Sequence, residues 1–406
     1  MFKIFKKIFP YFFSLVNVLF YSFIFFLLKN IFKKKIVLFY YGLVGSPENH
    51  IVLAKELIKN FKKKNDNITF FIFLDFFLLT KFNKFINRRH LKYLININIL
   101  IVNHSKFILP LNTINILLPH DIYDSFPWKT ESLFQPSELH LDSEKFLFQF
   151  QYILCPNLIV KNMFIKKINL LKKNKEAFYY LNLRKEINLL DAGYFKLDYI
   201  VNKIKNYKIK DSILLLPSIF GFFSTDYVIE LIKKINTTFH KYNVILRPHP
   251  AHYRQNKKFY QKLLFCFRNN SKFILDTNSM YIESFSRSII AISESSGSSY
   301  TYAFSTLRPV LFVFLNKLNS YQKSTYYYRD IKKIGILSKN TQDILIKIKK
   351  LISNQSNFQK KIFIFRKKRI KFYGKSSSIF CDLLKNITKK NNLEKIKVTK
   401  IRIIRD

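Results

Sequence analysis

The chain has 406 residues, of which 49% are hydrophobic and 17% aromatic, so it can form two domains with separate cores and is not intrinsically disordered. Its net charge of +45 favours anionic membranes and anionic substrates. A nucleic-acid-binding protein is not expected, because the lysines are scattered and most phenylalanines lie in apolar, strand-like runs.

The first predicted element is a hydrophobic helix, because the stretch from Ile8 to Leu28 contains no charged residue. About 20 apolar residues are needed to cross the hydrocarbon core of a bilayer. Lysines flank the stretch on both sides, and no small-residue cleavage site follows it. We interpret residues 1–35 as a membrane anchor that spans the bilayer or lies deep in its interface. A helix buried on the first domain is the alternative.

A strand over residues 36–41, a glycine loop and a helix starting at Ser46 form a Rossmann-like opening. Ser46 is suited to cap the helix, and Pro47 to be its first residue. The loop has neither GxGxxG nor a phosphate-loop lysine, so a dinucleotide-binding or NTPase domain is not indicated. Gly45 and Ser46 are candidate acceptor contacts, and a plain helix cap explains Ser46 equally well.

Short apolar runs alternate with helical stretches along the rest of the chain, which is typical of doubly wound parallel sheets. We therefore predict an α/β protein with two Rossmann-like domains, residues 36–193 and 194–388, followed by a basic tail at 389–406. Further strands are expected at 68–74, 97–102, 114–118, 152–154, 187–190, 212–216, 243–246, 289–292 and 309–314. The three cysteines are widely spaced, so neither a disulfide framework nor a zinc site is predicted, and a reducing compartment is the default.

One strand of the first domain ends in a histidine, at Pro119-His120-Asp121. Ligands of open α/β sheets bind outside the carboxyl ends of the strands. Asp121 could orient the imidazole of His120 and raise its basicity, which a general base requires. The alternative is a histidine that only forms structural hydrogen bonds.

Two strand ends of the second domain carry groups suited to a diphosphate. The run before Arg247 stops at Arg-Pro-His-Pro, which offers a guanidinium and the imidazole of His249 on a rigid backbone. The loop Ser295-Ser296-Gly297-Ser298 supplies hydroxyls and amides just before a predicted helix, whose N-terminus favours an anion. A proline-rich turn and a serine cap would explain each half separately. Their joint occurrence favours a diphosphate site.

The order of these landmarks resembles the CDP-glycerol glycerophosphotransferase family of bacterial surface-polymer enzymes. The resemblance covers most of the chain after residue 36 and is carried by LPHDIYDS, DAGYFKLD, RPHP, ISESSGSS with RPVLFV, and GKSSS. This chain has Glu294-Ser-Ser-Gly297 where the family usually has Asp-Tyr-Ser-Ser. The resemblance implies a GT-B fold, with His120 as the base and with Arg247, His249 and the serines at 295, 296 and 298 on the donor diphosphate.

The implied activity is the transfer of glycerol phosphate or a related polyol phosphate from a CDP-linked donor to a hydroxyl of a lipid-linked or saccharide acceptor. It would serve the synthesis of a teichoic acid-like polymer or capsule at the cytoplasmic face of the bacterial membrane. No metal or cofactor is implied. One alternative is a GT-B glycosyltransferase that uses a CMP- or UDP-sugar, although its acidic base motif is not found. Another is a non-enzymatic basic protein held by charge to a membrane surface or nucleic acid.

Overall fold

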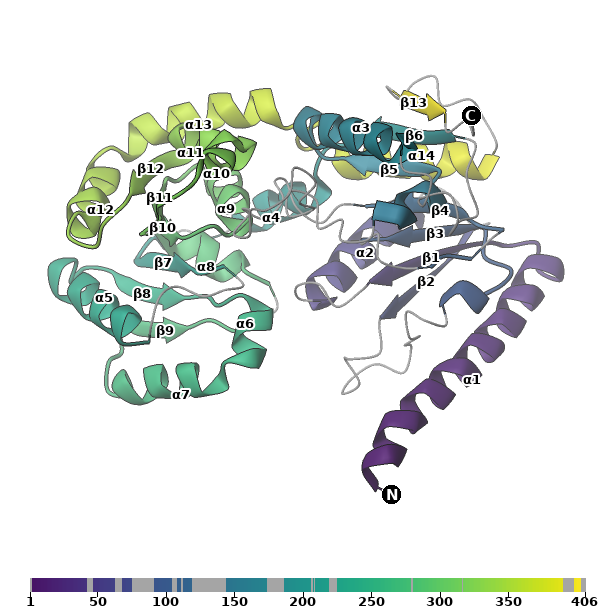
Figure 1. Cartoon of the computed structure of the whole chain (residues 1–406), viewed down its shortest axis with the longest axis horizontal. Coiled ribbons are helices and arrows are strands. Elements are labelled where there is room, and N and C mark those ends of the chain that lie inside the picture. The colour runs from purple at the N-terminus through teal and green to yellow at the C-terminus, as the bar shows by residue number, and fades with distance from the viewer. Residues whose placement is uncertain are drawn as a thin grey trace. The chain divides into compact units, whose positions relative to one another are not determined.

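The computed structural model describes residues 2–41, 47–62, 68–74, 91–103, 108–110, 112–118, 144–173, 186–205, 207, 209–218, 225–278, 280–315, 317–389 and 398–402. These residues form two compact units, each with its own sheet (Figure 1). Unit 1 contains the described residues up to Leu118, those from Glu144 to Phe195, and those from Lys371 on. Unit 2 contains the described residues from Lys196 to Ile370.

Unit 1 is organised around a seven-stranded sheet in the order β13-β6-β5-β4-β3-β1-β2. All neighbouring strands are parallel except β13, which is antiparallel to β6. The strands are β1 (Lys35–Tyr41), β2 (Ile68–Leu74), β3 (Ile99–Val102), β4 (Ile114–Leu117), β5 (Tyr152–Cys155), β6 (Glu186–Asp191) and β13 (Val398–Arg402).

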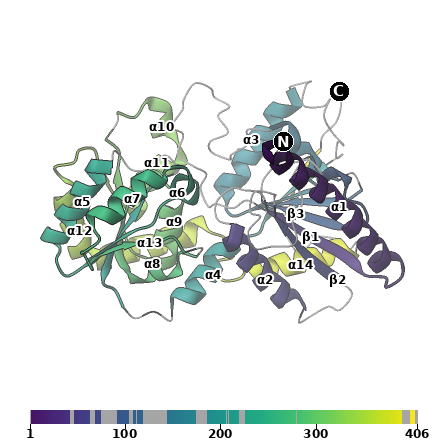
Figure 2. The same cartoon turned by 90° about the horizontal axis from the view of Figure 1, so that it is seen from below.

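Helices cover both faces of this sheet, as expected for strands that are apolar on both sides (Figure 2). On one face, α2 (Pro47–Lys62) and α14 (Ser376–Lys389) pack on Val37 and Phe39 of β1. On the other face lie α3 (Leu158–Lys173) and α1 (Phe2–Asn30), and the ring of Tyr21 meets Phe73 edge to face at 4.6 Å. Short 3-10 helices occur at Leu91–Tyr93 and Glu144–Gln149. Among the described residues, no helix combines the length and apolarity that crossing a membrane requires.

Unit 2 is organised around a six-stranded parallel sheet in the order β12-β11-β10-β7-β8-β9. The strands are β7 (Ser212–Leu216), β8 (Asn243–Leu246), β9 (Phe273–Leu275), β10 (Ser288–Ser293), β11 (Val310–Val313) and β12 (Gly335–Ser338). The helices are α4 (Phe195–Ile204), α5 (Thr225–Thr238), α6 (Pro250–Gln255), α7 (Lys257–Cys266), α8 (Ile282–Arg287), α9 (Ser298–Thr306), α10 (Ser320–Ser324), α11 (Tyr326–Ile334), α12 (Ile344–Ser353) and α13 (Gln355–Arg369).

The alternation of side chains along β11 shows how both faces of this second sheet are buried. Leu311 and Val313 belong to the apolar cluster formed with α5, α7 and α12. Phe312 points to the other face, where its ring contacts Tyr300 of α9 and Tyr327 of α11. The prediction of an α/β fold with parallel sheets is confirmed. Three strands were not predicted, namely β9, β12 and β13.

The C-terminal segment departs from the sequence-based assignment. Residues up to 388 were assigned to the second domain and the remainder to a tail, yet α14 packs in unit 1 and β13 extends the sheet of unit 1. Phe380, Leu383 and Leu384 of α14 are buried against α2 and the sheet. Helical periodicity identifies such an apolar face but not the sheet that it covers. In addition, β13 is short and basic, so its strand character depends on pairing with β6.

The return of the chain to unit 1 is fixed at Gly193 and Asp191. Asp191, at the carboxyl end of β6, is buried between Lys161 of α3 at 3.3 Å and Lys371 at 3.0 Å. Gly193 has φ +72°, and a Cβ there would lie 2.5 Å from Ser376 Oγ and 2.8 Å from Lys371 O. The turn therefore requires glycine both for its backbone and for the close approach of the C-terminal segment.

We expect Gly193→Ala to lower the free energy of unfolding by about 2–4 kcal/mol, because left-handed strain and overpacking add. Gly374→Ala is the matched control: Gly374 has φ +79° but no atom within 4 Å of its Cβ position, so only the strain of about 1–2 kcal/mol remains. Urea unfolding of the two variants measures the difference. Equal losses would show that the contact with Ser376 and Lys371 adapts without cost.

Candidate functional site

The candidate site lies at the carboxyl edge of the unit 2 sheet, where the strand order reverses. From β7 the chain adds β8 and β9 on one side and then crosses to add β10, β11 and β12 on the other. The carboxyl ends of β7 and β10 therefore flank the topological switch point, the usual place for a ligand in an open α/β sheet. The residues that follow these two strands and β8 form the site.

Glu294 and Ser218 connect the two strand ends at the switch point. Ser218 Oγ, after β7, donates to Glu294 Oε2, after β10, at 3.2 Å. Burial raises the pKa of the Glu294 carboxyl to about 7, and the hydrogen bond from Ser218 opposes that rise only in part. Glu294 therefore changes its charge near neutral pH. A partly buried carboxyl with a displaced pKa in this position is a candidate functional group.

The serine loop after Glu294 is held in a fixed conformation at the start of α9. Ser295 and Ser296 are buried, and the Oγ atoms of Ser296 and Ser298 lie 2.6 Å apart. The carbonyl of Ser296 accepts hydrogen bonds from Tyr327 Oη at 3.1 Å and from Ser299 Oγ at 2.6 Å. Because the loop is already ordered, a ligand that binds its hydroxyls incurs little additional ordering cost.

Gly297 stands at the N-cap of α9 with φ −58° and ψ −28°. This backbone conformation is open to any residue, so it does not explain the glycine. The N-terminus of a helix carries partial positive charge, which favours an anion. In α9 the amides of Ser299 and Tyr300 already donate to the carbonyls of Ser296 and Gly297, at 3.0 and 3.3 Å. The hydroxyls of Ser296 and Ser298, together with the positive end of α9, are thus suited to a phosphate group. The structure brings the four predicted residues Ser295, Ser296, Gly297 and Ser298 together in this loop.

His249 follows β8 and is the N-cap of α6. Its Nδ1 accepts a hydrogen bond from the amide of Ala251 at 3.2 Å, and Pro250 occupies the first helical position. Since Nδ1 is an acceptor, the neutral ring carries its proton on Nε2. The half-buried imidazole thus has a fixed orientation and a donor at Nε2.

Arg247 is engaged within unit 2. Its Nη1 donates to Asp276 Oδ2 at 2.6 Å, and its Nη2 donates to the carbonyl of Asn278 at 2.7 Å. The guanidinium also lies over the ring of Tyr281, 5.2 Å from its centroid. These contacts join the end of β8 to the segment after β9. They give Arg247 a structural role that the sequence analysis did not foresee, and its contact with a diphosphate stays a prediction.

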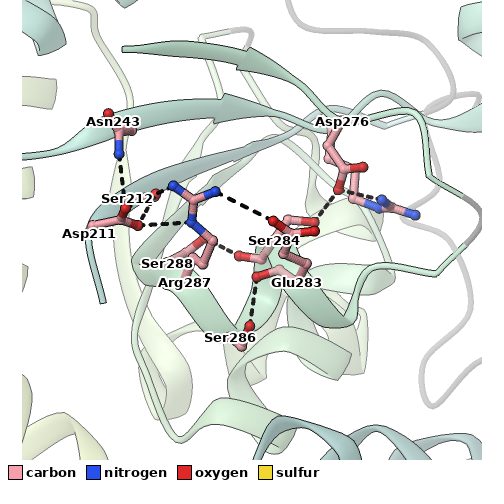
Figure 3. A network of polar contacts seen from close by, with 10 residues as sticks. Asp211, Ser212, Asn243, Asp276, Glu283, Ser284, Ser286, Arg287 and Ser288 are labelled. Atoms are coloured by element: carbon pink, nitrogen blue, oxygen red, sulfur yellow. Dashed lines mark hydrogen bonds and ion pairs between the residues drawn. The ribbon is translucent and has the colours of Figure 1, made fainter. Parts of the chain in front are cut away.

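A polar network extends from Asp276 to the opposite edge of the sheet (Figure 3). Ser284 of α8 donates to Asp276, and Ser288 donates to the carbonyl of Ser284. Arg287 then binds both oxygens of Asp211, at 3.1 and 2.8 Å. Hydrogen bonding to Arg287 lowers the pKa of Asp211. The network couples the position of the Arg247–Asp276 pair to α8 and to the start of β7.

The other predicted site residues, His120, Asp121, Gly45 and Ser46, lie outside the described residues. The structure describes the strands that precede them, β1 to Tyr41 and β4 to Leu117. No role was predicted from the sequence for Ser218, Glu294 or Tyr327. The acidic residue inside ISESSGSS, directly before two serines, was the available signal for Glu294. Ser218 and Tyr327 carry no local signal, because their partners are 76 and 31 residues away.

No protein-family model matches the chain, and no curated protein matches it. Solved structures do match. The wall teichoic acid polymerase TagF, soaked with CDPG, is 16% identical with a TM-score of 0.57, over 88% of this chain and 89% of that one. The shared feature is the fold. A putative UDP-N-acetylglucosamine 2-epimerase of Listeria monocytogenes is 13% identical with a TM-score of 0.56, over 88% and 98% of the two chains. The UDP-GlcNAc 2-epimerase of Neisseria meningitidis, bound to UDP-GlcNAc, is 14% identical with a TM-score of 0.55, over 87% and 100%.

Proposed function

We propose that the chain is a GT-B transferase of cell-surface polymer synthesis that moves glycerol phosphate or a related polyol phosphate from a CDP-linked donor to a hydroxyl acceptor. The observation that carries this proposal is the ordered serine loop at the N-terminus of α9, next to the switch point of unit 2. It offers hydroxyl groups and the positive end of a helix where open α/β sheets bind ligands. The TagF structure, which was soaked with CDPG, shares the fold and supports a cytidine donor.

The proposed reaction is a displacement at phosphorus. The acceptor hydroxyl attacks the β-phosphorus of the donor, a new P–O bond forms, and the bond from this phosphorus to the bridging oxygen breaks. CMP leaves with the electron pair, and His120, the base that we propose, takes the proton of the hydroxyl. The hydroxyls of Ser296 and Ser298, the positive end of α9 and Nε2 of His249 stabilise the charge that develops on CMP.

The first test is binding of a nucleotide-linked donor to the purified chain. We expect CDP-glycerol to bind, and Ser296→Ala combined with Ser298→Ala to weaken binding by about 10²- to 10⁴-fold, since two hydrogen bonds to a charged group, at about 1.5–3 kcal/mol each, contribute about 3–6 kcal/mol. Isothermal titration calorimetry measures the change. Ser353→Ala, an exposed hydroxyl at the end of α12, is the control and leaves the affinity unchanged.

Turnover distinguishes the base from the binding residues. His120→Ala is expected to keep the donor affinity and to lose transfer of labelled glycerol phosphate. Full activity of this variant would remove His120 from the proposal. Failure of CDP-glycerol, CMP and UDP to bind would refute the transferase itself and favour a protein that acts through its charge alone.

A UDP-sugar 2-epimerase is the second candidate, because the chain aligns with nearly the whole length of two such enzymes. An epimerase needs no acceptor hydroxyl. Incubation with UDP-GlcNAc in the absence of any acceptor therefore separates the two functions. Formation of the 2-epimer or of free UDP would favour the epimerase, and no change in the sugar nucleotide would favour the transferase.

A further inference from the structure

The N-terminal helix α1 has two opposite faces with different surroundings. One face packs on β1 and β2: Phe25 is buried, with its ring 4.8 Å from that of Phe71, and Tyr21 meets Phe73. The buried positions recur every three or four residues, as on one side of a helix. They are Ser14, Asn17, Val18, Tyr21, Ser22 and Phe25.

Between residues 14 and 28, the exposed face of α1 is more apolar than the buried one. Its large exposed side chains are Leu15, Val16, Leu19, Phe20, Phe23 and Phe26. The polar residues Ser14, Asn17 and Ser22 all lie on the buried side. A helix on the surface of a water-soluble domain shows the reverse arrangement, with polar residues outward. The exposed face is therefore suited to an apolar environment.

Neighbouring side chains enlarge this surface. The amide of Ile95 donates to Ser22 Oγ at 3.3 Å, and Asn96 Nδ2 donates to the carbonyl of Ser22 at 3.5 Å. The segment around Ile95 thus lies beside α1, and both Tyr93 and Ile95 are exposed. Ile31 and Phe32 continue the exposed apolar residues beyond the end of the helix. Large exposed apolar side chains that cluster in this way mark an interaction site.

The charges around the surface identify its partner. No acidic residue occurs among residues 1–47, whereas Lys29, Lys33 and Lys92 are exposed next to the apolar residues. A second copy of the same face would bring like charges together. An apolar surface with a basic rim instead matches a bilayer that carries anionic headgroups. Tyr93 adds an aromatic residue of the kind that is enriched at the headgroup level.

We propose that α1 lies in the plane of an anionic membrane surface, with its exposed face inserted at the boundary between headgroups and acyl chains and its other face kept on the sheet of unit 1. This retains the interfacial alternative of the sequence analysis and replaces the spanning one. The proposal does not depend on the reaction that the protein catalyses.

Co-sedimentation of the full chain with vesicles tests the proposal. We expect binding to vesicles with about 30% phosphatidylglycerol and at least about tenfold weaker binding to pure phosphatidylcholine or at about 0.5 M salt. The triple variant Leu19→Gln, Phe23→Gln, Phe26→Gln should lose at least about tenfold in vesicle partitioning, because most of the inserted area is removed. Replacement of Lys29, Lys33 and Lys92 by Gln should weaken the preference for anionic lipid, whereas replacement of three exposed lysines of unit 2, Lys234, Lys262 and Lys272, should leave it unchanged.

The control triple variant is Phe265→Gln, Ile346→Gln, Ile364→Gln in unit 2, where the side chains are 66%, 70% and 68% exposed, against 65%, 61% and 48% for Leu19, Phe23 and Phe26. It should bind vesicles like the unmodified chain. All variants should keep the same melting temperature. Equal binding by the α1 triple variant would overturn the proposal. The proposal would also be overturned if the unmodified chain did not bind vesicles and instead formed a dimer that the α1 triple variant abolished. Resistance of the membrane-bound chain to extraction by alkaline carbonate would overturn it as well, because such resistance indicates a spanning segment.

Discussion

Replacement of Arg247 by alanine is expected to lower the free energy of unfolding of unit 2 by about 3–5 kcal/mol, because it leaves the carboxylate of Asp276 buried without its cation. The pair is 2.6 Å apart, and both side chains are more than nine-tenths buried. The same substitution also removes the hydrogen bond to the carbonyl of Asn278 and the contact with Tyr281. Urea unfolding followed by fluorescence measures the loss.

Two further variants separate the buried pair from charge in general. Lys234→Ala breaks an ion pair with Glu230 whose side chains are 58% and 61% exposed, and it should cost less than about 1 kcal/mol. Combining Arg247→Met with Asp276→Leu removes both charges and should recover part of the stability that Arg247→Ala loses. The recovery is partial because Ser284 Oγ and the amide of Asn278 lose their acceptor, Asp276. A stable Arg247→Ala protein that no longer binds CDP-glycerol would instead make Arg247 a direct ligand of the diphosphate.

The strands that the sequence predicts well are those that are buried on both faces. The runs at 212–216 and 243–246 were predicted with the bounds of β7 and β8, since continuous apolar residues that end in polar loops are sufficient evidence. By contrast, β9 has three half-buried residues, and β12 begins with Gly335, which a strand pattern does not favour. These two segments form strands because they pair with β8 and β11, and their own residues do not indicate a strand.

The candidate site was predictable to the extent that its residues are adjacent in sequence. The serine loop and His249 stand next to strand ends and were found in that way. The partner of Arg247 was not predictable, because Asp276 lies 29 residues away and follows a strand that was itself missed. A guanidinium looks equally suited to a buried carboxylate and to a phosphate until the fold shows which groups surround it.

Replacement of Glu294 by glutamine is expected to remove the part of the pH dependence of donor binding that is centred near pH 7. The pKa of Glu294 is about 7, so the carboxyl is largely neutral below this pH and negative above it. A negative charge beside the serine loop repels a diphosphate. If binding requires the neutral form, the affinity falls by up to about tenfold per pH unit above pH 7. CDP-glycerol is the suitable probe, because its diphosphate is a diester with no ionisation in this range.

Calorimetric titrations from about pH 6 to 8.5 measure this effect. Glu283→Gln, which changes an exposed carboxylate on α8, is the matched control and keeps the profile of the unmodified chain. An unchanged profile in Glu294→Gln would show that this carboxyl does not sense the donor.

The same substitution has a signature that needs no ligand. The folded-state pKa of Glu294, about 7, lies above its ordinary value of 4.5, so the folded protein binds the proton more tightly than the unfolded chain. This contribution to stability is fully present below pH 4.5 and is lost as the pH rises through about 7. Glu294→Gln should therefore flatten the decline in the free energy of unfolding between these values. If Glu294→Gln changes the pH dependence of the free energy of unfolding but not that of donor binding, Glu294 stabilises the ends of β7 and β10 and does not contact the donor.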